Sequence, residues 1–143
     1  MAAVNSKLKF VVIDVGAYGH QSDCGVFKAS KIGQCLSQGA LNLPPSNQLP
    51  SCHIITPYVF VGDEAFQLSP DFLRPYPGRY LSDDLRIFNY RLCRARRCVE
   101  NEFGILATEF RIFRRPIGLL PDYATGVVLA ACVLHNYLRD DEL

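Results

Sequence analysis

Residues 91–110 read RLCRARRCVENEFGILATEF, and this stretch predicts a long helix with one buried face. Because an α-helix turns once every 3.6 residues, apolar side chains that recur at steps of three or four lie on one side. Glu100 stands beside this stripe, between Val99 and Phe103, and a carboxylate next to an apolar face needs a partner or a function. The apolar stripe comprises Phe88, Leu92, Ala95, Val99, Phe103, Leu106 and Phe110.

The helix is predicted to begin at Ser82, which can cap it and is followed by two aspartates near the positive end of the helix dipole. It is expected to end within residues 107–110, before a basic connector at residues 111–116. A last, nearly all-apolar helix is predicted over residues 123–138.

Upstream, residues 8–16 read LKFVVIDVG and predict a strand, because they are rich in Val and Ile and bounded by polar residues and a glycine. Residues 2–4 are predicted to be the end of a preceding strand, joined by a tight turn at Asn5 and Ser6. That preceding strand is almost absent, so we expect the chain to begin inside a fold.

One helix is predicted from Ser22 or Asp23 to about residue 38, with Gly39 as its stop. The four prolines within residues 42–57 predict a surface loop without helix or strand. A short buried strand is expected next, over residues 58–61, and the glycine that follows it lets the chain turn.

The predicted helices and strands alternate, which indicates an α/β fold with helices around a sheet. The 143 residues suit one domain with a real core, and a hydrophobic content of 49% excludes a disordered chain. The longest apolar run, residues 126–134, is too short to span a bilayer, so no membrane is expected as a partner. All six cysteines are expected to be free thiols in a reducing compartment. Cys52 and His53 are two adjacent possible zinc ligands, but without a second pair they are weak evidence for a zinc site.

Charge is segregated along the chain although the net charge is only +1. Residues 86–115 hold eight arginines against three glutamates, a local charge of +5. Such a face suits phosphates, and three of these arginines are candidate contacts for a nucleic-acid backbone: Arg94, Arg96 and Arg97. The alternative is an ordinary solvated helix face with intrahelical ion pairs.

Asp63 at a strand end and Glu100 on a helix form a candidate pair of metal ligands. Two-metal cleavage of phosphodiesters requires two or three converging carboxylates, and hard divalent ions prefer oxygen ligands. By spacing alone the pair is weak evidence for a metal site, because a satisfied helix cap or an ion pair also explains each acid.

The local sequence adds a resemblance. The blocks VFVGDEAFQLSPDFLRPYP, RIFNYRLCRARRCVENEFGILATEFRIFRRP and VLAACVLHNYL resemble successive blocks of the PIF/Harbinger transposase family, which includes transposase-derived nucleases with a DDE superfamily endonuclease domain. IDVGAYGHQSDCGVF is similar to that family's strand, glycine-rich loop and helix start. The resemblance covers essentially the whole chain in the right order.

The resemblance implies an RNase H-like (DDE) fold, with residues 1–143 as a partial endonuclease domain. It places the second catalytic acid at Asp63 and the helix-borne catalytic acid at Glu100, as ligands of Mg²⁺ or Mn²⁺. Asp23 is expected to act as a helix cap. His135 and Asn136 are expected to be buried hydrogen-bonding partners rather than ligands.

The chain also departs from the family pattern. Family members carry the first catalytic acid in an Asp-Gly-Thr-type motif on the first, central strand, and this sequence contains no Asp-Gly dipeptide. Asp14 cannot simply be assumed to replace that acid. We therefore expect a domain truncated at its N-terminus, without the first central strand, and with exposed pairing edges in the remaining sheet.

The resemblance thus implies a DDE-type nuclease domain that acts on DNA in the nucleus, or also in the cytoplasm, and whose activity is impaired by the missing acid. A protein partner is expected to supply DNA binding, because the family's N-terminal helical DNA-binding region is missing. Two alternatives remain open: a non-catalytic DNA- or protein-binding remnant of a domesticated transposase, and an artefactual fragment of a longer gene.

Overall fold

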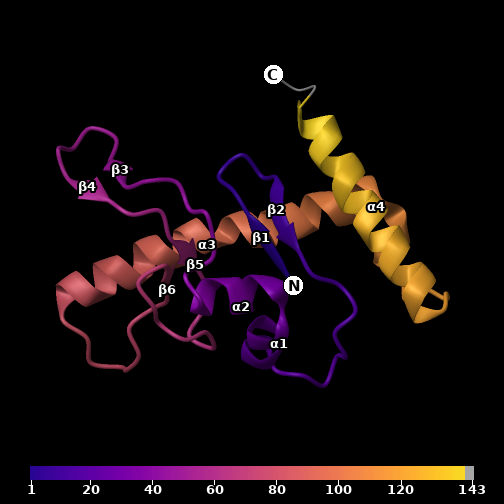
Figure 1. Ribbon diagram of the computed structural model, residues 1–143, viewed down its shortest axis with the longest axis horizontal. Coiled ribbons are helices and arrows are strands. Elements are labelled where there is room, and N and C mark those ends of the chain that lie inside the picture. Colours follow the sequence, from indigo (N-terminus) through magenta and orange to yellow (C-terminus); the bar gives the residue numbers. More distant parts are fainter. Residues whose placement is uncertain (141–143) are drawn as a thin grey trace. The chain divides into compact units, whose positions relative to one another are not determined.

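The computed structural model describes residues 1–140 and contains four α-helices and six short strands (Figure 1). The chain divides into two compact units, which are described separately. Unit 1 consists of residues 1–21 and the chain from Arg97 onward, and unit 2 consists of Ser22–Arg96. The long helix α3 (Asp83–Glu109) contributes residues to both.

Unit 1 is built on a β-hairpin. Strand β1 (Ala2–Val4) pairs antiparallel with β2 (Phe10–Ile13), and the register shifts between Ala3 and Val4. The Oδ1 atom of Asn5 accepts hydrogen bonds from the backbone N–H groups of two lysines and closes the turn. The predicted hairpin is therefore confirmed, although β2 is shorter than the predicted strand.

Two further helical elements complete unit 1. A short 3₁₀-helix, η1 (Arg111–Arg114), follows α3 in the predicted basic connector, and α4 (Pro121–Asp140) confirms the predicted last helix. The buried core joins the hairpin to the ends of α3 and α4, because partly buried apolar residues from all three surround it. Its members are Phe10, Leu106, Ala131 and Cys132.

The single helix predicted from Ser22 to residue 38 is wrong: unit 2 has two helices there, α1 (Asp23–Ala29) and α2 (Lys31–Ser37). Ser30 has an extended backbone and separates the two helices. It is the C-cap residue of α1 and the N-cap residue of α2. Its hydroxyl donates to the carbonyl oxygen of Phe27 at 2.6 Å and accepts from the N–H of Gly33 at 3.1 Å. Serine competes for backbone groups in this way, and so it ends one helix while capping the next.

Unit 2 also contains two small ladders. Strands β3 (Asn47–Gln48) and β4 (Ile55–Thr56) pair antiparallel inside the region expected to lack strands. That expectation is wrong because the prolines flank the paired residues and leave their N–H groups available. Strand β5 (Phe60–Val61) pairs in parallel with β6 (Phe72–Leu73) and confirms part of the predicted strand over residues 58–61.

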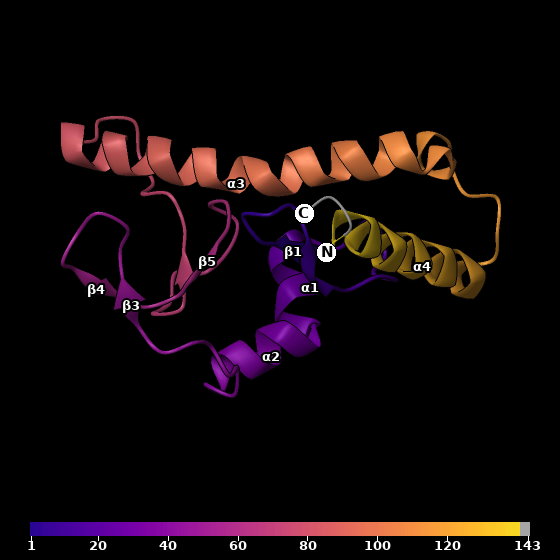
Figure 2. The same cartoon turned by 90° about the horizontal axis from the view of Figure 1, so that it is seen from above.

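Helix α3 runs without interruption over 27 residues, with the predicted start and end (Figure 2). Its predicted apolar stripe is only partly buried. Leu92 and Leu106 are buried, whereas Ala95 is exposed and the Phe103 side chain is 48% exposed. In unit 1 the row of buried residues on α3 includes Glu102 instead of Phe103. The Glu102 side chain is fully buried.

The strands of the described residues form three separate two-stranded ladders. The expected alternation of helices and strands around one sheet is therefore replaced by a mixed α/β arrangement with small sheets. Among residues 1–140, no helix has the length and apolarity needed to cross a membrane.

Candidate functional site

Asp63 lies in a turn that immediately follows strand β5, as predicted. Its Oδ1 atom accepts a hydrogen bond from the backbone N–H of Ala65 at 3.0 Å, the local arrangement typical of aspartate in a turn. The side chain is half-buried. This hydrogen bond fixes the carboxylate at the strand end, which is the placement that a rigid metal ligand requires.

Gly62 allows two aromatic rings to approach this turn. A Cβ atom at position 62 would lie 2.6 Å from ring atoms of Phe72 and 2.8 Å from a ring atom of Phe66. The two rings also contact each other, with centroids 5.2 Å apart. The glycine before Asp63 is therefore required by packing, and it couples the position of the carboxylate to an aromatic cluster.

Gly62→Ala is expected to destabilise the turn by about 1–3 kcal/mol, because the added methyl group overlaps the two rings. Amide hydrogen exchange of the full chain measures the effect as faster exchange in residues 58–75, with exchange in residues 1–21 unchanged. Gly19→Ala is the matched control, since a Cβ atom there meets nothing within 4 Å. Equal protection of the turn in both variants would contradict this packing role.

Glu100 lies on α3 in unit 1 and its side chain is exposed. It is therefore not the acid that the apolar face buries. Asp63 belongs to unit 2, so the structure describes the surroundings of each carboxylate but not their separation. The predicted assignment of both as catalytic metal ligands stays a prediction.

The donor chemistry of these two acids fits a divalent cation, because Mg²⁺ and Mn²⁺ prefer carboxylate oxygens. The number of donors falls short of a complete site. Within residues 1–140, no group of three or more His, Cys, Asp or Glu side chains could hold a metal ion. Asp63 and Glu100 can thus supply part of a ligand set.

The candidate phosphate contacts lie at the middle of α3. Arg94 and Arg97 are exposed and Arg96 is half-buried. The guanidinium carbon of Arg94 lies 5.8 Å from the centroid of the Tyr90 ring, a cation–π distance. Near the N-terminal end of α3, Arg86 pairs with Asp83 at 3.2 Å, as expected for the solvated-face alternative.

A buried carboxylate–imidazole cluster, missed by the sequence analysis, joins α3 to α4 in unit 1. The side chains of Glu102 and His135 are both completely buried. His135 Nδ1 lies 2.8 Å from Glu109 Oε2, and Nε2 lies 2.5 Å from Glu102 Oε1. Nε2 also lies 3.2 Å from the carbonyl oxygen of Leu8 in the hairpin.

Both ring nitrogens of His135 therefore face oxygen atoms of carboxyl or carbonyl groups. The angles at Nε2 favour the carbonyl of Leu8, and no aligned donor reaches either oxygen of Glu102 in the described part of the chain. The short contact between Glu102 and His135 is thus a close polar approach rather than a well-aligned hydrogen bond.

Burial raises the pKa of the Glu102 carboxyl above its ordinary value. The charges of His135 and Arg139 act in the opposite direction, whereas Glu109 adds to the rise. Burial and then the charge of Glu102 also raise the pKa of the Cys132 thiol, which therefore packs in the core as a neutral thiol.

Asn136 binds the backbone of β2 with both ends of its amide. Its Oδ1 accepts from the N–H of Phe10 at 2.9 Å, and its Nδ2 donates to the carbonyl oxygen of Phe10 at 2.8 Å. The prediction that His135 and Asn136 are hydrogen-bonding partners is confirmed. Through these two residues α4 holds the hairpin, and Asn136 occupies the edge of β2 at Phe10.

The other predicted polar residues have local roles. Ser22 caps α1 by accepting from the N–H of Gly25, so Asp23 is not the cap but an acid in the first turn. His53 Nδ1 lies 3.0 Å from Nε2 of Gln48 in the β3–β4 region. All six cysteines are free thiols.

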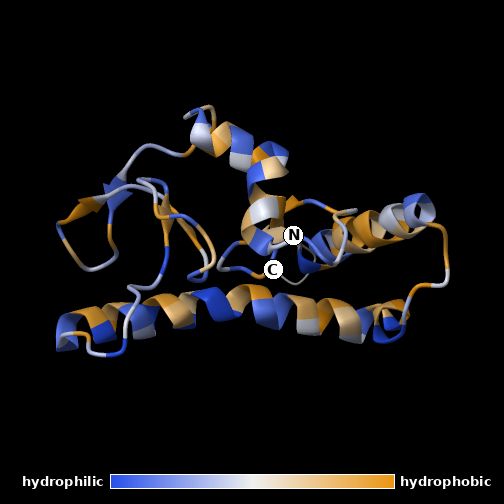
Figure 3. Cartoon of the chain, turned by 90° about the horizontal axis from the view of Figure 1, so that it is seen from below, coloured by the Kyte–Doolittle hydropathy of each residue, from blue (hydrophilic) through white to orange (hydrophobic). Residues whose placement is uncertain are grey.

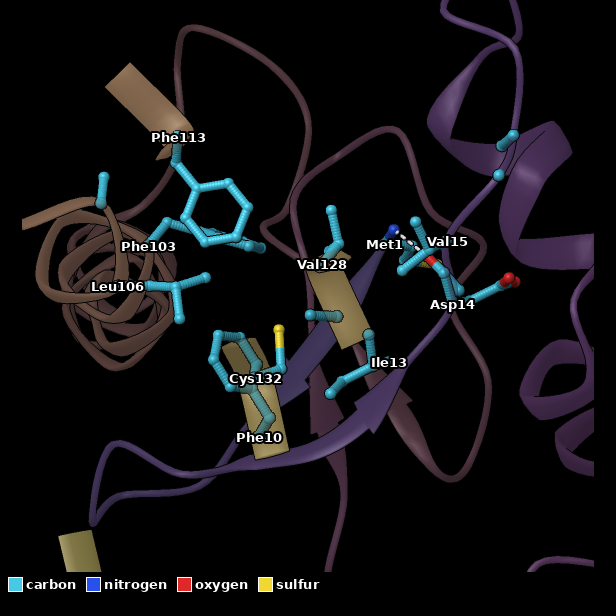
Figure 4. Close-up of a pocket in the computed structure, with 14 residues that line it drawn as sticks. Met1, Phe10, Ile13, Asp14, Val15, Phe103, Leu106, Phe113, Val128 and Cys132 are labelled. Atoms are coloured by element: carbon cyan, nitrogen blue, oxygen red, sulfur yellow. Dashed lines mark hydrogen bonds between the residues drawn. The ribbon is translucent and has the colours of Figure 1, made fainter. Parts of the chain in front are cut away.

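An apolar cavity of about 440 Å³ lies in unit 1 between the hairpin and the two helices (Figure 4). Phe10, Leu106 and Cys132 line it together with Asp14 at the end of β2. Figure 4 shows the Asp14 carboxylate directed away from the apolar lining. The structure therefore gives no reason to assign Asp14 the role of a further catalytic acid.

Comparison with known protein families gives a match over residues 1–136 to the DDE superfamily endonuclease model. The chain belongs to the DDE superfamily endonuclease family. Membership in a DDE superfamily endonuclease family suggests a nuclease-type, transposase-derived function and an RNase H-like fold for this α/β chain. DNA is the substrate on which DDE endonucleases act, and they typically use divalent metal ions. No similarity to a curated protein or to a solved structure was found.

Proposed function

We propose that the chain is a Harbinger-like DDE nuclease domain whose Asp63 and Glu100 bind Mg²⁺ or Mn²⁺ and whose catalytic activity is impaired. The observation that carries the proposal is the match of nearly the whole chain to the DDE endonuclease family, with Asp63 fixed at a strand end. A bound divalent ion supplies Lewis-acid activation of water or a DNA 3′-hydroxyl and stabilises the leaving oxygen. Asp63 and Glu100 would each supply carboxylate oxygens for metal binding.

DNA is the proposed polyanionic partner. Arg94, Arg96 and Arg97 lie on the same helix as Glu100 and supply positive charge for phosphate contacts. We place the protein in the nucleus, with a protein partner that contributes DNA binding. Such contacts release counterions from the DNA, and this release is less favourable at high salt, so affinity is expected to fall steeply with salt concentration.

Impaired catalysis is proposed because only two acids are assigned to a reaction that uses three. In a plasmid-nicking assay with Mg²⁺ or Mn²⁺, the full chain is expected to show no more nicking than its Asp63→Ala variant. Glu64→Ala is the matched control, since Glu64 is an exposed neighbour in the same turn. Turnover that Asp63→Ala abolishes and Glu64→Ala preserves would show that the domain is active.

Manganese binding separates the proposal from the alternative of a non-catalytic remnant. Calorimetric titration of the full chain with Mn²⁺ is expected to detect binding, and Glu100→Gln is expected to weaken it roughly tenfold or more. The absence of binding, or binding that Glu100→Gln leaves unchanged, would favour a DNA- or protein-binding remnant.

A further inference from the structure

A second cavity lies in unit 2, between α3 and the β5–β6 ladder. It is an open groove of about 370 Å³, near the lower end of the range for sites that hold a small molecule. Val61 and Leu73 form its strand side, and they are the paired last residues of two parallel strands. In open α/β sheets, ligands bind at the carboxyl ends of parallel strands, so the groove lies where a ligand is expected.

The groove is connected to the turn that carries Asp63. The last residue of β5 is two positions before Asp63 in the chain, and the last residue of β6 is followed directly by Arg74. The Nη1 atom of Arg74 donates hydrogen bonds to the carbonyl oxygens of Glu64 and Phe66, both at 3.0 Å. Both strand ends that form the groove are therefore fixed to the turn that holds a candidate metal ligand.

The helix side of the groove has an acid at one end, an apolar centre and a base at the other end. Figure 3 shows hydrophilic and hydrophobic residues alternating along α3. Four of them line the groove at steps of three or four residues, which places them on one side of the helix: Asp84, Ile87, Phe88 and Arg91. Ile87 is 50% exposed, so the apolar centre is open to a ligand. The acid and the base are about 10 Å apart along the helix, at 1.5 Å per residue.

The two charged groups at the ends of the groove are available to a ligand. Asp84 and Arg91 are both exposed. Among residues 1–140, neither side chain forms a hydrogen bond or an ion pair within the chain, whereas the neighbouring Asp83 pairs with Arg86. The groove therefore presents one free carboxylate and one free guanidinium, with apolar surface between them.

Charge and shape favour a DNA strand with an unpaired base as the ligand. From Arg86 to Arg97 every charged residue of α3 is an arginine, and guanidinium groups bind phosphate through paired hydrogen bonds. The apolar centre of the groove suits the flat face of a base. A duplex hides the faces and the Watson–Crick edges of its bases, whereas an unpaired base exposes both.

The carboxylate at the acidic end of the groove distinguishes among the bases. A carboxylate only accepts hydrogen bonds, and guanine is the base with two adjacent N–H donors, at N1 and N2, on its Watson–Crick edge. We propose, resting on the DNA partner of the proposed function, that the groove binds one unpaired guanine nucleotide of a DNA strand. Arg91 binds its phosphate, Ile87 packs against the face of the base, and Asp84 accepts hydrogen bonds from N1 and N2.

Fluorescence anisotropy of the full chain with labelled single strands tests this site, in EDTA so that no divalent ion takes part. A thymine strand with a single central guanine should bind about tenfold more tightly than an all-thymine strand. Asp84→Asn should remove this preference, because an amide presents one acceptor and one donor in place of two acceptors. Asp83→Asn is the matched control and should keep the preference, since it removes the same charge from the same helical turn outside the groove.

The basic end of the groove is tested in the same assay. Arg91→Gln should weaken the binding of both strands by about fivefold or more, because the phosphate loses a charged contact. Arg79→Gln is the control and should weaken binding much less, since Arg79 is an exposed arginine of unit 2 outside the groove.

The possible results separate this site from the proposed function. Equal affinity for the two strands, a guanine preference that Asp84→Asn leaves intact, or one that Asp83→Asn removes equally would overturn the groove site and leave DNA binding in place. Tighter binding of a duplex of the same sequence than of the single strand would do the same. The absence of binding to every strand, single or double, would overturn both the groove site and the DNA partner of the proposed function.

Discussion

Replacing His135 with alanine is expected to lower the free energy of unfolding of unit 1 by about 3–5 kcal/mol, because the buried Glu102 side chain then loses its polar partner and a cavity is left in the packed interior. Glu102 and His135 are completely buried, and His135 Nε2 lies 2.5 Å from Glu102 Oε1. The substitution also removes the link from His135 to Glu109 and to the carbonyl of Leu8. The ends of α3, α4 and the hairpin all lose a shared contact.

Amide hydrogen exchange locates this effect within the full chain. His135→Ala should speed exchange in β2 and the second half of α4, whereas α1 and α2 in unit 2 keep their protection. His20→Ala is the matched control, because His20 is an exposed histidine of unit 1. If His135→Ala changed protection no more than His20→Ala, the buried pair would have no stabilising role.

The pH dependence of stability follows from the raised pKa of the Glu102 carboxyl. The folded state holds this proton more tightly than the unfolded state, whose carboxyl titrates near pH 4.3. The stability that Glu102 contributes is therefore complete below that pH and is lost as pH rises through the raised pKa. Glu102→Gln, which keeps the shape of the side chain, removes this part of the pH dependence.

The spacing of apolar residues predicted the bounds of α3 but not which acid its inner face buries. Leu92, Val99 and Leu106 are compatible with two adjacent rows on the helix, one through Phe103 and one through Glu102. Hydrophobicity alone favours burial of the row that contains Phe103. The structure buries Glu102 where His135, which lies 33 positions later in the sequence, supplies a buried polar partner. A histidine on the inner face of a later apolar helix could have indicated that an acid of α3 is buried beside it.

Elements that depend on local chemistry were also predictable. The hairpin turn at Asn5 and the turn containing Asp63 follow from side chains that satisfy nearby backbone groups. That His135 and Asn136 form hydrogen bonds was predictable because buried polar side chains need partners. Their partners, Leu8 and Phe10, lie far away in the sequence and were not predicted. The metal-ligand roles of Asp63 and Glu100 remain predictions from family resemblance. Convergence of side chains from distant parts of a chain depends on tertiary structure, which sequence spacing does not determine.

The break between α1 and α2 shows the reverse case, in which local hydrogen bonds of a serine override a helical pattern. Apolar spacing continues from Val26 to Leu36 and predicts one helix. Ser30 instead bonds to backbone groups on both sides, and the chain turns so sharply that Gly33 lies directly against Phe27. Helix propensity would favour alanine at position 33, but this contact excludes it.

Gly33→Ala is consequently expected to destabilise unit 2 by about 3 kcal/mol or more. The added Cβ atom would lie 1.9 Å from the carbonyl oxygen and 2.8 Å from the carbonyl carbon of Phe27. These are backbone atoms, so no side-chain rotation relieves the overlap, and either the Ser30 cap or the packing of α1 on α2 must be lost. Hydrogen exchange should show loss of protection in α1 and α2, with α4 unchanged.

Gly104→Ala is the same chemical change and is expected to have the opposite effect on stability. Gly104 lies within α3, and a Cβ atom there meets nothing within 4 Å. Alanine restricts the unfolded chain and is a better helix former, so this variant should be more stable by about 0.5–1 kcal/mol. If Gly33→Ala were tolerated as well as Gly104→Ala, the two helices could not meet at Ser30 as described, and the continuous helix predicted from the sequence would be the better description of residues 23–37.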